Sequence, residues 1–318
     1  MPPALVCCKA GLVSLIFAVG LPGVTQAEWQ RDASSIAWCD GTNIVWRLSF
    51  DTNRGKPFFH PVSVRGGPVL TNFKPEDHPW HYGLWFSWKY INKANYWEED
   101  RRTGRAEGAT RWAVPIIETR PDGSATIKLD LTYVHPSGRV DLTEQRKLQI
   151  SAPKSDGSYT IDWHAKFTAG EQGAFLDRTP MPGEPGGQVN GGYAGLSLRV
   201  AGPPLGISFV CSTGLVSRFE HDRARPAAAA LGCNFIHGTN CIGSIAILSD
   251  PGNGFENPPW YMVNSEVMRF ACAAILAPKP LNIPAGGTLN LRYRIIVSAN
   301  ALTPAALRAV HAEWVGAK

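Results

Sequence analysis

Apolar and polar residues alternate with a period of two along several stretches of the chain. In residues 159–167, Tyr, Ile, Trp, Ala and Phe alternate with Thr, Asp, His and Lys. A strand with this pattern buries one face and exposes the other. Residues 44–50, 127–133 and 289–297 alternate in the same way, and Gly and Pro interrupt such runs about every ten residues. This rhythm predicts an all-β sandwich or barrel.

Two further patterns complete the predicted fold. The turn Pro136-Ser137-Gly138 leads from the second alternating run into a strand ending at Ile150, which predicts a hairpin. Near the C-terminus, Thr303 can cap a helix that begins with Pro304 and continues to Trp314. The Pro- and Gly-rich residues 178–192 predict a surface loop, with similar strands on both sides. We expect one large β-sandwich domain, residues 28–318, with a short C-terminal helix.

The first 27 residues have the pattern of an export signal. Lys9 precedes an apolar run from Ala10 to Leu21, and Ala27 offers a small residue at a cleavage point. The run is too short to span a bilayer comfortably. We therefore expect a periplasmic or secreted protein with a signal peptide at residues 1–27 and no membrane span after cleavage. An uncleaved N-terminal anchor is the alternative.

Composition and charge narrow the function. The net charge of +5 is spread along 318 residues without a basic stripe, so nucleic acid is not an expected partner. The charged residues 98–102 are most simply interpreted as a solvated loop with internal ion pairs. The sequence has no Gly-rich phosphate loop, no GxSxG and no HExxH, which argues against nucleotide cofactors, serine esterases and zinc peptidases.

Histidines and aromatic residues concentrate in residues 77–97. His78 and His81 are candidates for a general acid and base because imidazole titrates near neutral pH, and His60 is a third candidate. Asp77 or Glu98 can orient an imidazole or act as the opposing base. The predicted ligand contacts in this part of the chain are of two kinds. Flat faces for sugar rings are expected from Trp80, Trp85, Trp88 and Trp97, and polar contacts from Arg65, Lys89 and Asn92.

Other interpretations use the same residues. A tight turn with structural histidines and core tryptophans would also produce this pattern. Three histidines with a carboxylate suit zinc, copper or iron. However, the spacing of His78 and His81 gives no reason for both rings to face one ion, so no metal or other cofactor is predicted.

Two further segments offer candidates. Glu144 and Arg146 lie on the same face of a predicted strand, where they can line a cleft as a catalytic carboxylate and a ligand contact, or simply form an ion pair. Trp260 follows Asn257-Pro258-Pro259 in a loop, where it can close the same pocket or pack on proline.

Several blocks together resemble a bacterial family of secreted proteins labelled PmoA-like, or methane oxygenase PmoA. They are residues 57–61, 77–86, 92–97, 143–146 and 191–196 and the loop 250–260. The chain departs from the family pattern at Trp80, where a histidine is common, and at Asp250-Pro251, where a histidine often found beside the aspartate is missing. The resemblance implies an exported β-sandwich of the galactose-mutarotase type, often associated with sugar catabolism.

These observations favour an exported carbohydrate-active enzyme, a hydrolase, lyase or epimerase, whose ligand is a small molecule or an oligosaccharide. Two alternatives remain open at this point. One is a non-catalytic carbohydrate-binding protein that uses the same aromatic residues, and the other is a metal-dependent oxidative enzyme, as the PmoA label suggests.

Overall fold

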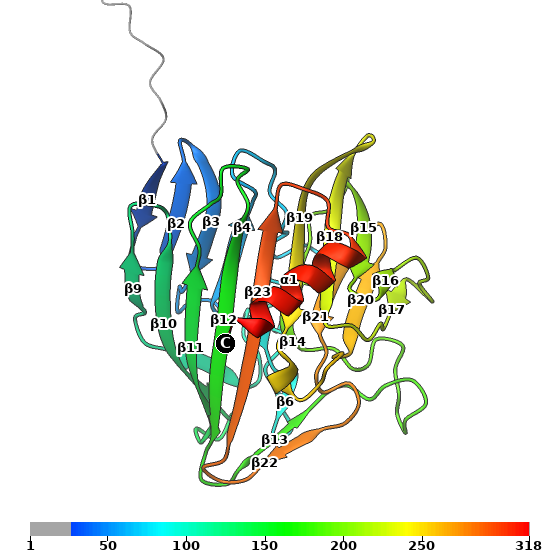
Figure 1. Ribbon diagram of the computed structural model, residues 1–318. Coiled ribbons are helices and arrows are strands. Elements are labelled where there is room, and N and C mark those ends of the chain that lie inside the picture. The colour runs from blue at the N-terminus through cyan, green and yellow to red at the C-terminus, as the bar shows by residue number, and fades with distance from the viewer. Residues whose placement is uncertain (1–26, 318) are drawn as a thin grey trace, which may run out of the picture.

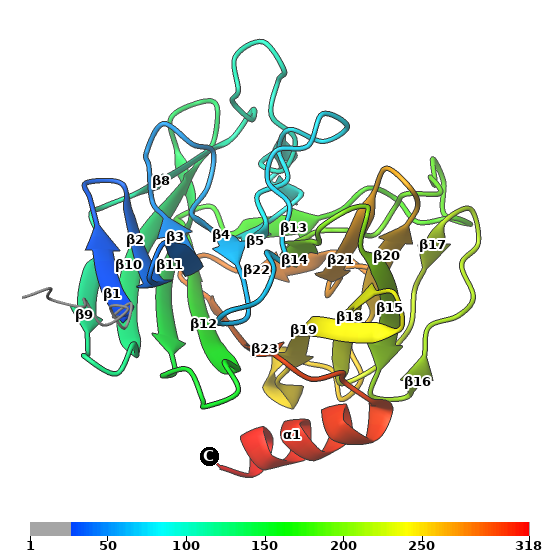
Figure 2. The same cartoon turned by 90° about the horizontal axis from the view of Figure 1, so that it is seen from above.

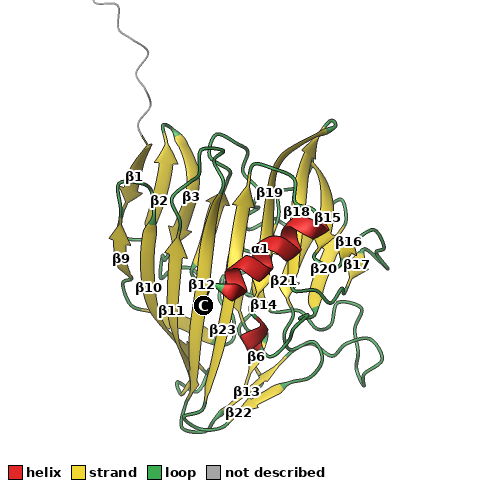
Figure 3. Ribbon diagram, in the orientation of Figure 1, coloured by secondary structure: helices red, strands yellow, loops and turns green. Residues whose placement is uncertain are grey.

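The computed structural model describes residues 27–317, and almost all of its regular structure is β-strand (Figure 3). Two large antiparallel sheets pack face to face (Figures 1 and 2). The first has nine strands in the order β1 (Ala27–Arg31), β2 (Ser35–Asp40), β3 (Asn43–Ser49), β4 (Phe58–Val62), β5 (Leu84–Ser87), β14 (Gly195–Arg199), β21 (Arg269–Ala273), β20 (Trp260–Asn264) and β17 (Arg223–Ala224).

The second sheet has ten strands. Their order is β16 (Gly214–Leu215), β15 (Gly206–Cys211), β18 (Ala230–His237), β19 (Asn240–Ser249), β23 (Thr288–Ser298), β12 (Tyr159–Ala169), β11 (Val140–Ile150), β10 (Ala125–Val134) and β8 (Ala109–Trp112), with β9 (Ile116–Thr119) also paired to β10. A small third sheet contains β22 (Leu281–Ile283), β13 (Ala174–Asp177), β6 (Tyr90–Ile91) and β7 (Ala94–Asn95), and a 3-10 turn, η1, covers Pro251–Asn253.

The predicted all-β sandwich with a short C-terminal helix is confirmed. The alternating runs form β3, β10, β12 and β23, and β10 pairs with β11 as the predicted hairpin. The helix α1 runs over Pro304–Gly316, and the Thr303 hydroxyl accepts a hydrogen bond from the Ala306 amide at 3.1 Å, as expected for an N-cap.

Burial along the strands shows which faces are covered. In β10, β11 and β12, buried and more exposed residues alternate, because one face packs between the sheets and the other meets water. In β5 and β14, by contrast, every residue is buried. Their inward side chains, such as Leu84 and Phe86, belong to the core between the sheets, whereas Trp85 packs in a second cluster on the outer face. Other segments of the chain therefore cover the outer face of the nine-stranded sheet at β5 and β14.

Long loops provide this cover. The segments that follow β4 and β7 rise from the outer side of the nine-stranded sheet, while α1 lies along the opposite side of the molecule, outside the ten-stranded sheet (Figure 2). Leu307 and Trp314 of α1 are buried against β15, β18 and β19 in a third apolar cluster. The loop-covered outer face is the place to look for a site.

The predicted export signal lies outside the described residues, except for Ala27, and the assignment of residues 28–318 to one domain stays a prediction. Across residues 27–317, no helix has the length and apolar character needed to cross a membrane.

Candidate functional site

A cavity of about 210 Å³ lies on the outer face of the nine-stranded sheet. Aromatic rings and a few polar groups line it, as is usual for sites that bind small molecules. Strands β20 and β21 form its floor, with Met268 in the turn between them and Arg223 in β17, and the loops after β4, β7 and β13 contribute the remaining residues. Its lining consists of His78, Trp80, His81, Trp97, Glu98, Asn190, Tyr193, Arg223, Tyr261, Met268 and Phe270.

Two consecutive turns hold the histidines. The amide of His78 donates to the carbonyl of Pro75 at 3.1 Å, and the amide of His81 donates to the carbonyl of His78 at 3.0 Å. The chain then enters β5 through Gly83, whose φ is 76°. A Cβ at this position would lie 2.4 Å from the carbonyl oxygen of Phe59, so only glycine fits. The loop is thereby fixed against β4.

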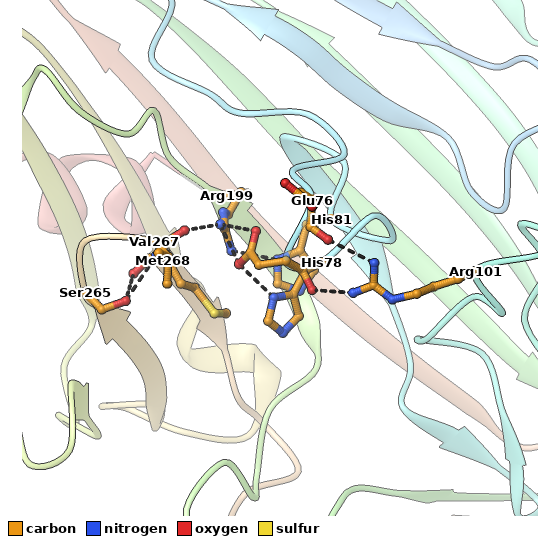
Figure 4. A network of polar contacts seen from close by, with 9 residues as sticks. Glu76, His78, His81, Arg101, Arg199, Ser265, Val267 and Met268 are labelled. Atoms are coloured by element: carbon orange, nitrogen blue, oxygen red, sulfur yellow. Dashed lines mark hydrogen bonds and ion pairs between the residues drawn. The ribbon is translucent and has the colours of Figure 1, made fainter.

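Arg199, Asp77 and His78 form a connected polar chain (Figure 4). Arg199, the last residue of β14, is 1% exposed, and its Nη2 donates to both oxygens of Asp77 at 2.9 and 2.8 Å. The Nδ1 of His78 lies 2.8 Å from Oδ2 of Asp77. An ionised carboxylate only accepts hydrogen bonds, so Nδ1 carries a proton and Nε2 is the nitrogen available to a ligand.

Asp77 is therefore held as an anion that orients His78. Burial raises the pKa of Asp77, but the hydrogen bonds from His78 and Arg199 outweigh burial and hold the pKa below its ordinary value. Arg101 fixes the backbone of the same loop by donating to the carbonyls of Glu76 and Asp77, both at 3.0 Å (Figure 4). A carboxylate that orients the imidazole of a residue in the lining of a cavity is an arrangement suited to proton transfer.

His81 lies beneath His78 and has a different environment. The two rings stack with centroids 4.6 Å apart, and His81 stacks on Phe270 at 5.0 Å on its other side. Its Nδ1 has a long contact of 3.4 Å with Nη1 of Arg199, which can only donate. Burial, together with the positive charge of its neighbours, lowers the pKa of His81 well below its ordinary value. His81 is therefore neutral at physiological pH, with its proton on Nε2.

Glu98 is the carboxylate that lines the cavity. Tyr193 donates to its Oε1 at 2.5 Å, Asn95 donates to Oε2 at 2.7 Å, and Lys89 forms an ion pair with Oε2. Burial raises the pKa of Glu98, but the Lys89 ammonium and these hydrogen bonds lower it below its ordinary value. Both oxygens are engaged, so Glu98 is an anion that fixes Tyr193 and offers its remaining lone pairs to a ligand.

Glu99 forms a second buried pair below the cavity. Nζ of Lys56 lies 3.4 Å from its Oε1, and the hydroxyl of Tyr82 donates to its Oε2 at 2.6 Å. The interpretation of residues 98–102 as a solvated loop is therefore wrong for Glu98 and Glu99. Sequence alone could not show this, because the partners Lys56 and Tyr193 are distant along the chain.

The structure brings some of the predicted residues to the cavity. His78, His81 and Trp97 line it, and Lys89 lies behind Glu98. Trp85 is fully buried under His81, with ring centroids 5.1 Å apart, so it supports the site and does not reach the ligand space.

The structure places the other candidates elsewhere. Trp88 belongs to the core between the sheets, so it cannot offer a flat face to a sugar in the cavity. Trp260 is 1% exposed and donates to the carbonyl of Ala228 at 2.9 Å. Asn92 bonds to the backbone of Gly173 and Phe175 and so joins two loops beside the small sheet.

The predicted catalytic carboxylate Glu144 and its neighbour Arg146 do not line the cavity either. They share a face of β11, as predicted, but this face points into the sandwich, and they form an ion pair at 2.6 Å there. His60 hydrogen-bonds Thr71 at 2.9 Å and stacks on Phe73. Arg65 pairs with Asp40 at 2.9 Å on the surface.

Sequence reasoning missed Arg199, which binds Asp77 beside the cavity, and several residues that line the cavity itself. Arg199 left a visible signal, since it is a charged residue in the otherwise apolar run Leu196-Ser197-Leu198-Arg199-Val200. Tyr193 lies in one of the segments that resemble a known family, but the pattern around it predicts no role for it. Tyr261, Met268 and Phe270 lie in apolar strands or turns that look like ordinary core, so no local signal identifies them. Over the described residues 27–317, no three His, Cys, Asp or Glu side chains gather in a way that could hold a metal ion.

Solved structures with a similar course of the chain include enzymes that act on sugars. They are an α-galactosidase from Lactobacillus brevis (9% identity, TM-score 0.46, covering 86% of this chain and 40% of that one), the galactosidase domain of an α-galactosidase–sucrose kinase (8%, 0.43, 86% and 41%) and a putative aldose 1-epimerase from Klebsiella pneumoniae subsp. pneumoniae (8%, 0.46, 89% and 83%). The chain thus spans about 40% of the two galactosidase chains. Similarity of this degree assigns neither a substrate nor a reaction.

No curated protein matches this chain in sequence. A family model does, and it is described as a family of unknown function, DUF6807, with residues 38–312 matched. This match corrects the resemblance to the PmoA-like family. That resemblance rested on short blocks, several of which are the loop segments around the cavity, whereas the model follows both sheets and reaches α1. The chain belongs to the family of unknown function DUF6807.

Proposed function

We propose that this protein is a carbohydrate-active enzyme in which His78 moves a proton to or from a sugar ring bound in the cavity. The observation that carries the proposal is the chain from Arg199 through Asp77 to His78, which ends at an aromatic cavity. A volume of about 210 Å³ is smaller than that of usual drug-sized sites. It suits one sugar ring, with Trp97 and Tyr261 as apolar faces.

The polar groups suggest the type of reaction. Glycoside hydrolysis usually needs two carboxyl groups that exchange a proton or attack the sugar. Here both oxygens of Glu98 are engaged by Lys89, Asn95 and Tyr193, so Glu98 is better suited to binding hydroxyl groups. The free Nε2 of His78 is suited to taking a proton from the substrate, which favours an epimerase or lyase over a hydrolase.

Neutral His81 and Arg199 contribute in a different way. His81 can donate from Nε2 without adding a charge beside His78, and Arg199 keeps Asp77 ionised. Negative charge that develops on the substrate is stabilised by donors already fixed in place. Because residues 1–27 have the pattern of an export signal, we also propose that the reaction occurs in the periplasm or outside the cell. Fractionation of expressing cells would test this location.

The test compares His78→Asn with a matched histidine variant, His135→Asn. His135 lies in an exposed turn, where it contacts Ser137 at 2.9 Å. Each protein is incubated with a panel of mono- and disaccharides, and epimers, unsaturated products and released sugars are measured by NMR. We expect His78→Asn to lose a factor of about 10²–10⁴ in turnover, and His135→Asn to match the unchanged protein.

Two outcomes would decide against the proposal. Equal turnover in a folded His78→Asn variant would remove His78 from the mechanism. Sugar binding detected by calorimetry, without any product after days of incubation, would show a non-catalytic carbohydrate-binding protein instead.

A further inference from the structure

A second and larger hollow adjoins the cavity. It is an open groove of about 770 Å³ between the loop after β13 and the segment that joins β16 to β17. Arg223 lines both the cavity and the groove. The loop after β13 borders both as well, since it contributes Asn190 and Tyr193 to the cavity and Val189 to the groove. The two hollows are therefore neighbours on the surface, separated by Arg223 and bordered by the same loop.

The sheet fixes the position of Arg223 relative to the histidines. In the pairing register, Arg199 is opposite Phe270, Phe270 is opposite Val263, and Val263 is opposite Arg223. These four residues form one row across β14, β21, β20 and β17. Neighbouring strands are about 4.8 Å apart, so Arg223 starts roughly 10 Å from Phe270. Phe270 is the ring on which His81 stacks, so an arginine side chain from this position reaches the far side of a sugar held there.

A tight turn holds the arginine. The amide of Glu220 donates to the carbonyl of Arg223 at 2.8 Å, and the amide of Arg223 donates to the carbonyl of Glu220 at 2.9 Å. The two central residues, His221 and Asp222, both have positive φ, 49° and 64°. Residues other than glycine adopt this backbone conformation at a cost, and such strain concentrates at functional sites.

The charge of this surface is uncompensated. Nε of Arg223 donates to the Tyr261 hydroxyl at 3.2 Å and its Nη1 donates to the carbonyl of His221 at 2.5 Å. Arg225 donates to the carbonyls of Val189 and Gly191, at 2.7 and 2.9 Å. Within residues 27–317, neither arginine has a carboxylate within ion-pair distance.

The acidic groups around these arginines have other partners. Glu220, the carboxylate in the groove lining, pairs with the exposed Arg218 at 2.7 Å. In the cavity, Glu98 pairs with Lys89, and Asp77 beside it pairs with Arg199. The groove and the adjoining rim of the cavity therefore carry the positive charge of two guanidinium groups, and Nη2 of Arg223 makes no hydrogen bond to the described residues.

We infer that the ligand is an anionic carbohydrate, whose ring occupies the cavity and whose acidic group binds Arg223 at the entrance to the groove. This inference rests on the proposed function and names its substrate class. Guanidinium groups bind carboxylates, phosphates and sulfates through charge-assisted hydrogen bonds, which are stronger than those between neutral groups. The nearby Arg225 adds to the attraction, while its hydrogen bonds hold the loop that borders both hollows.

Calorimetry with pairs of acidic and neutral ligands tests the inference. The panel contains glucuronate, galacturonate and oligouronides of two to four rings, glucose 6-phosphate and glucose 6-sulfate, and the neutral sugars of matching length. We expect at least one acidic member to bind tenfold or more tightly than its neutral counterpart, and this preference to shrink as salt is raised. The carboxylate, phosphate and sulfate arms distinguish the sources of the negative charge.

Variants assign the preference to Arg223. Arg223→Gln is expected to weaken binding of the preferred acidic ligand tenfold or more while neutral sugars bind as before. The matched control Arg111→Gln removes the same charge from the exposed edge strand β8 of the ten-stranded sheet, outside both hollows, so binding should stay within a factor of two. Equal or tighter binding of the neutral sugars, no binding by any acidic member, or an equal loss in both variants would overturn the inference.

This result is separable from that of the proposed function. His78→Asn should keep its affinity for the acidic ligand while losing turnover. If that ligand binds through Arg223 but no protein variant ever turns it over, the inference holds and the enzyme proposal fails. If turnover depends on His78 but neutral sugars are preferred, the reverse is true.

Discussion

Two arginine–carboxylate pairs lie in different parts of the molecule, one outside the core between the sheets and one within it. Arg199 and Asp77 meet on the outer face of the nine-stranded sheet, and Arg146 and Glu144 meet inside the sandwich. Both arginines are almost completely buried, at 1% and 2% exposure. The sequence made Glu144 a candidate catalytic carboxylate or an ion-pair partner of Arg146, and it made Asp77 a candidate to orient an imidazole or act as the opposing base.

The two pairs differ in the other hydrogen-bond partner of the carboxylate. Asp77 also accepts a hydrogen bond from Nδ1 of His78, and His78 lines the cavity. Glu144 accepts from the Tyr133 hydroxyl at 2.6 Å, and the Arg146 guanidinium lies 4.6 Å from the Trp163 ring centre, so this network closes on itself. A buried ion pair indicates chemistry only where a titratable group leads from it to a ligand space.

Breaking the interior pair should have the largest effect. Glu144→Gln leaves the Arg146 charge buried without its partner, and removal of one member of such a pair costs about 3–5 kcal/mol of unfolding free energy. Chemical denaturation monitored by tryptophan fluorescence measures this loss. As a control, replacing both residues together, Glu144→Leu with Arg146→Met, should recover most of it. A loss below about 1 kcal/mol in Glu144→Gln would show that the pair is hydrated like a surface pair, and that the interior pair does not differ from the outer pair in its contribution to stability.

The same change at the outer pair should affect turnover more than stability. Asp77→Asn removes the charge that orients His78, and we expect turnover to fall roughly a hundredfold, about 2.7 kcal/mol of transition-state stabilisation. The Asp77 side chain is 25% exposed, so water can partly replace its contacts and the stability loss should be smaller than that of Glu144→Gln. Kinetics and denaturation on the same samples check both. A larger loss of stability in Asp77→Asn than in Glu144→Gln would reverse the comparison.

The contrast also shows what sequence could and could not predict. The strands and the C-terminal helix were predictable because alternation and capping are local patterns. Both histidines of the cavity were found because they lie within one loop, next to Asp77. Tyr193 and Phe270 reach the same cavity, and Arg199 reaches Asp77 beside it, from distant strands and loops, and only the sheet order brings them together.

The same limit explains the misplaced residues. Alternation showed that Glu144 and Arg146 share a face, but whether that face is the interior or a cleft depends on which sheet covers it. Trp85 and Trp88 differ in the same way, since one lies on the outer face and the other in the core. An aromatic run therefore predicted the site region correctly while leaving the role of each ring undetermined.

His60 extends the comparison to a histidine that is closed off from the cavity. Burial, with a smaller effect of the nearby Arg47 charge, lowers the pKa of His60 to about 4. Its ordinary value is 6.5, so between these values the unfolded chain binds the proton and the folded protein does not. Titration of His60 therefore leaves the free energy of unfolding unchanged above about pH 6.5 and lowers it as pH falls toward 4. The loss is about 2 kcal/mol once the partial exposure of the ring is allowed for.

Denaturation curves between pH 4 and 7.5 for the unchanged protein and for His60→Gln measure this dependence. The variant should lose less stability over the acidic half of the range, and its turnover at pH 7 should be unchanged. A parallel pH dependence of the two proteins would show that His60 titrates normally. A large loss of turnover would instead place it in the site.

The smallest effect is expected at Arg65, a predicted ligand contact that pairs with Asp40 on the surface. Its Nε lies 2.9 Å from Oδ2 of Asp40, but the Arg65 side chain is 42% exposed, so water and salt screen the pair. Exposed pairs contribute about 0–1 kcal/mol to stability. Arg65→Gln should therefore change the unfolding free energy by less than about 1 kcal/mol and leave sugar affinity unaltered. Calorimetry on Arg65→Gln and Arg223→Gln with the same ligand makes the comparison direct. Weakened binding in Arg65→Gln would mean that a charge remote from the cavity acts on the ligand. A position in the lining of the cavity would then not distinguish arginines that bind the ligand from arginines that only form surface ion pairs.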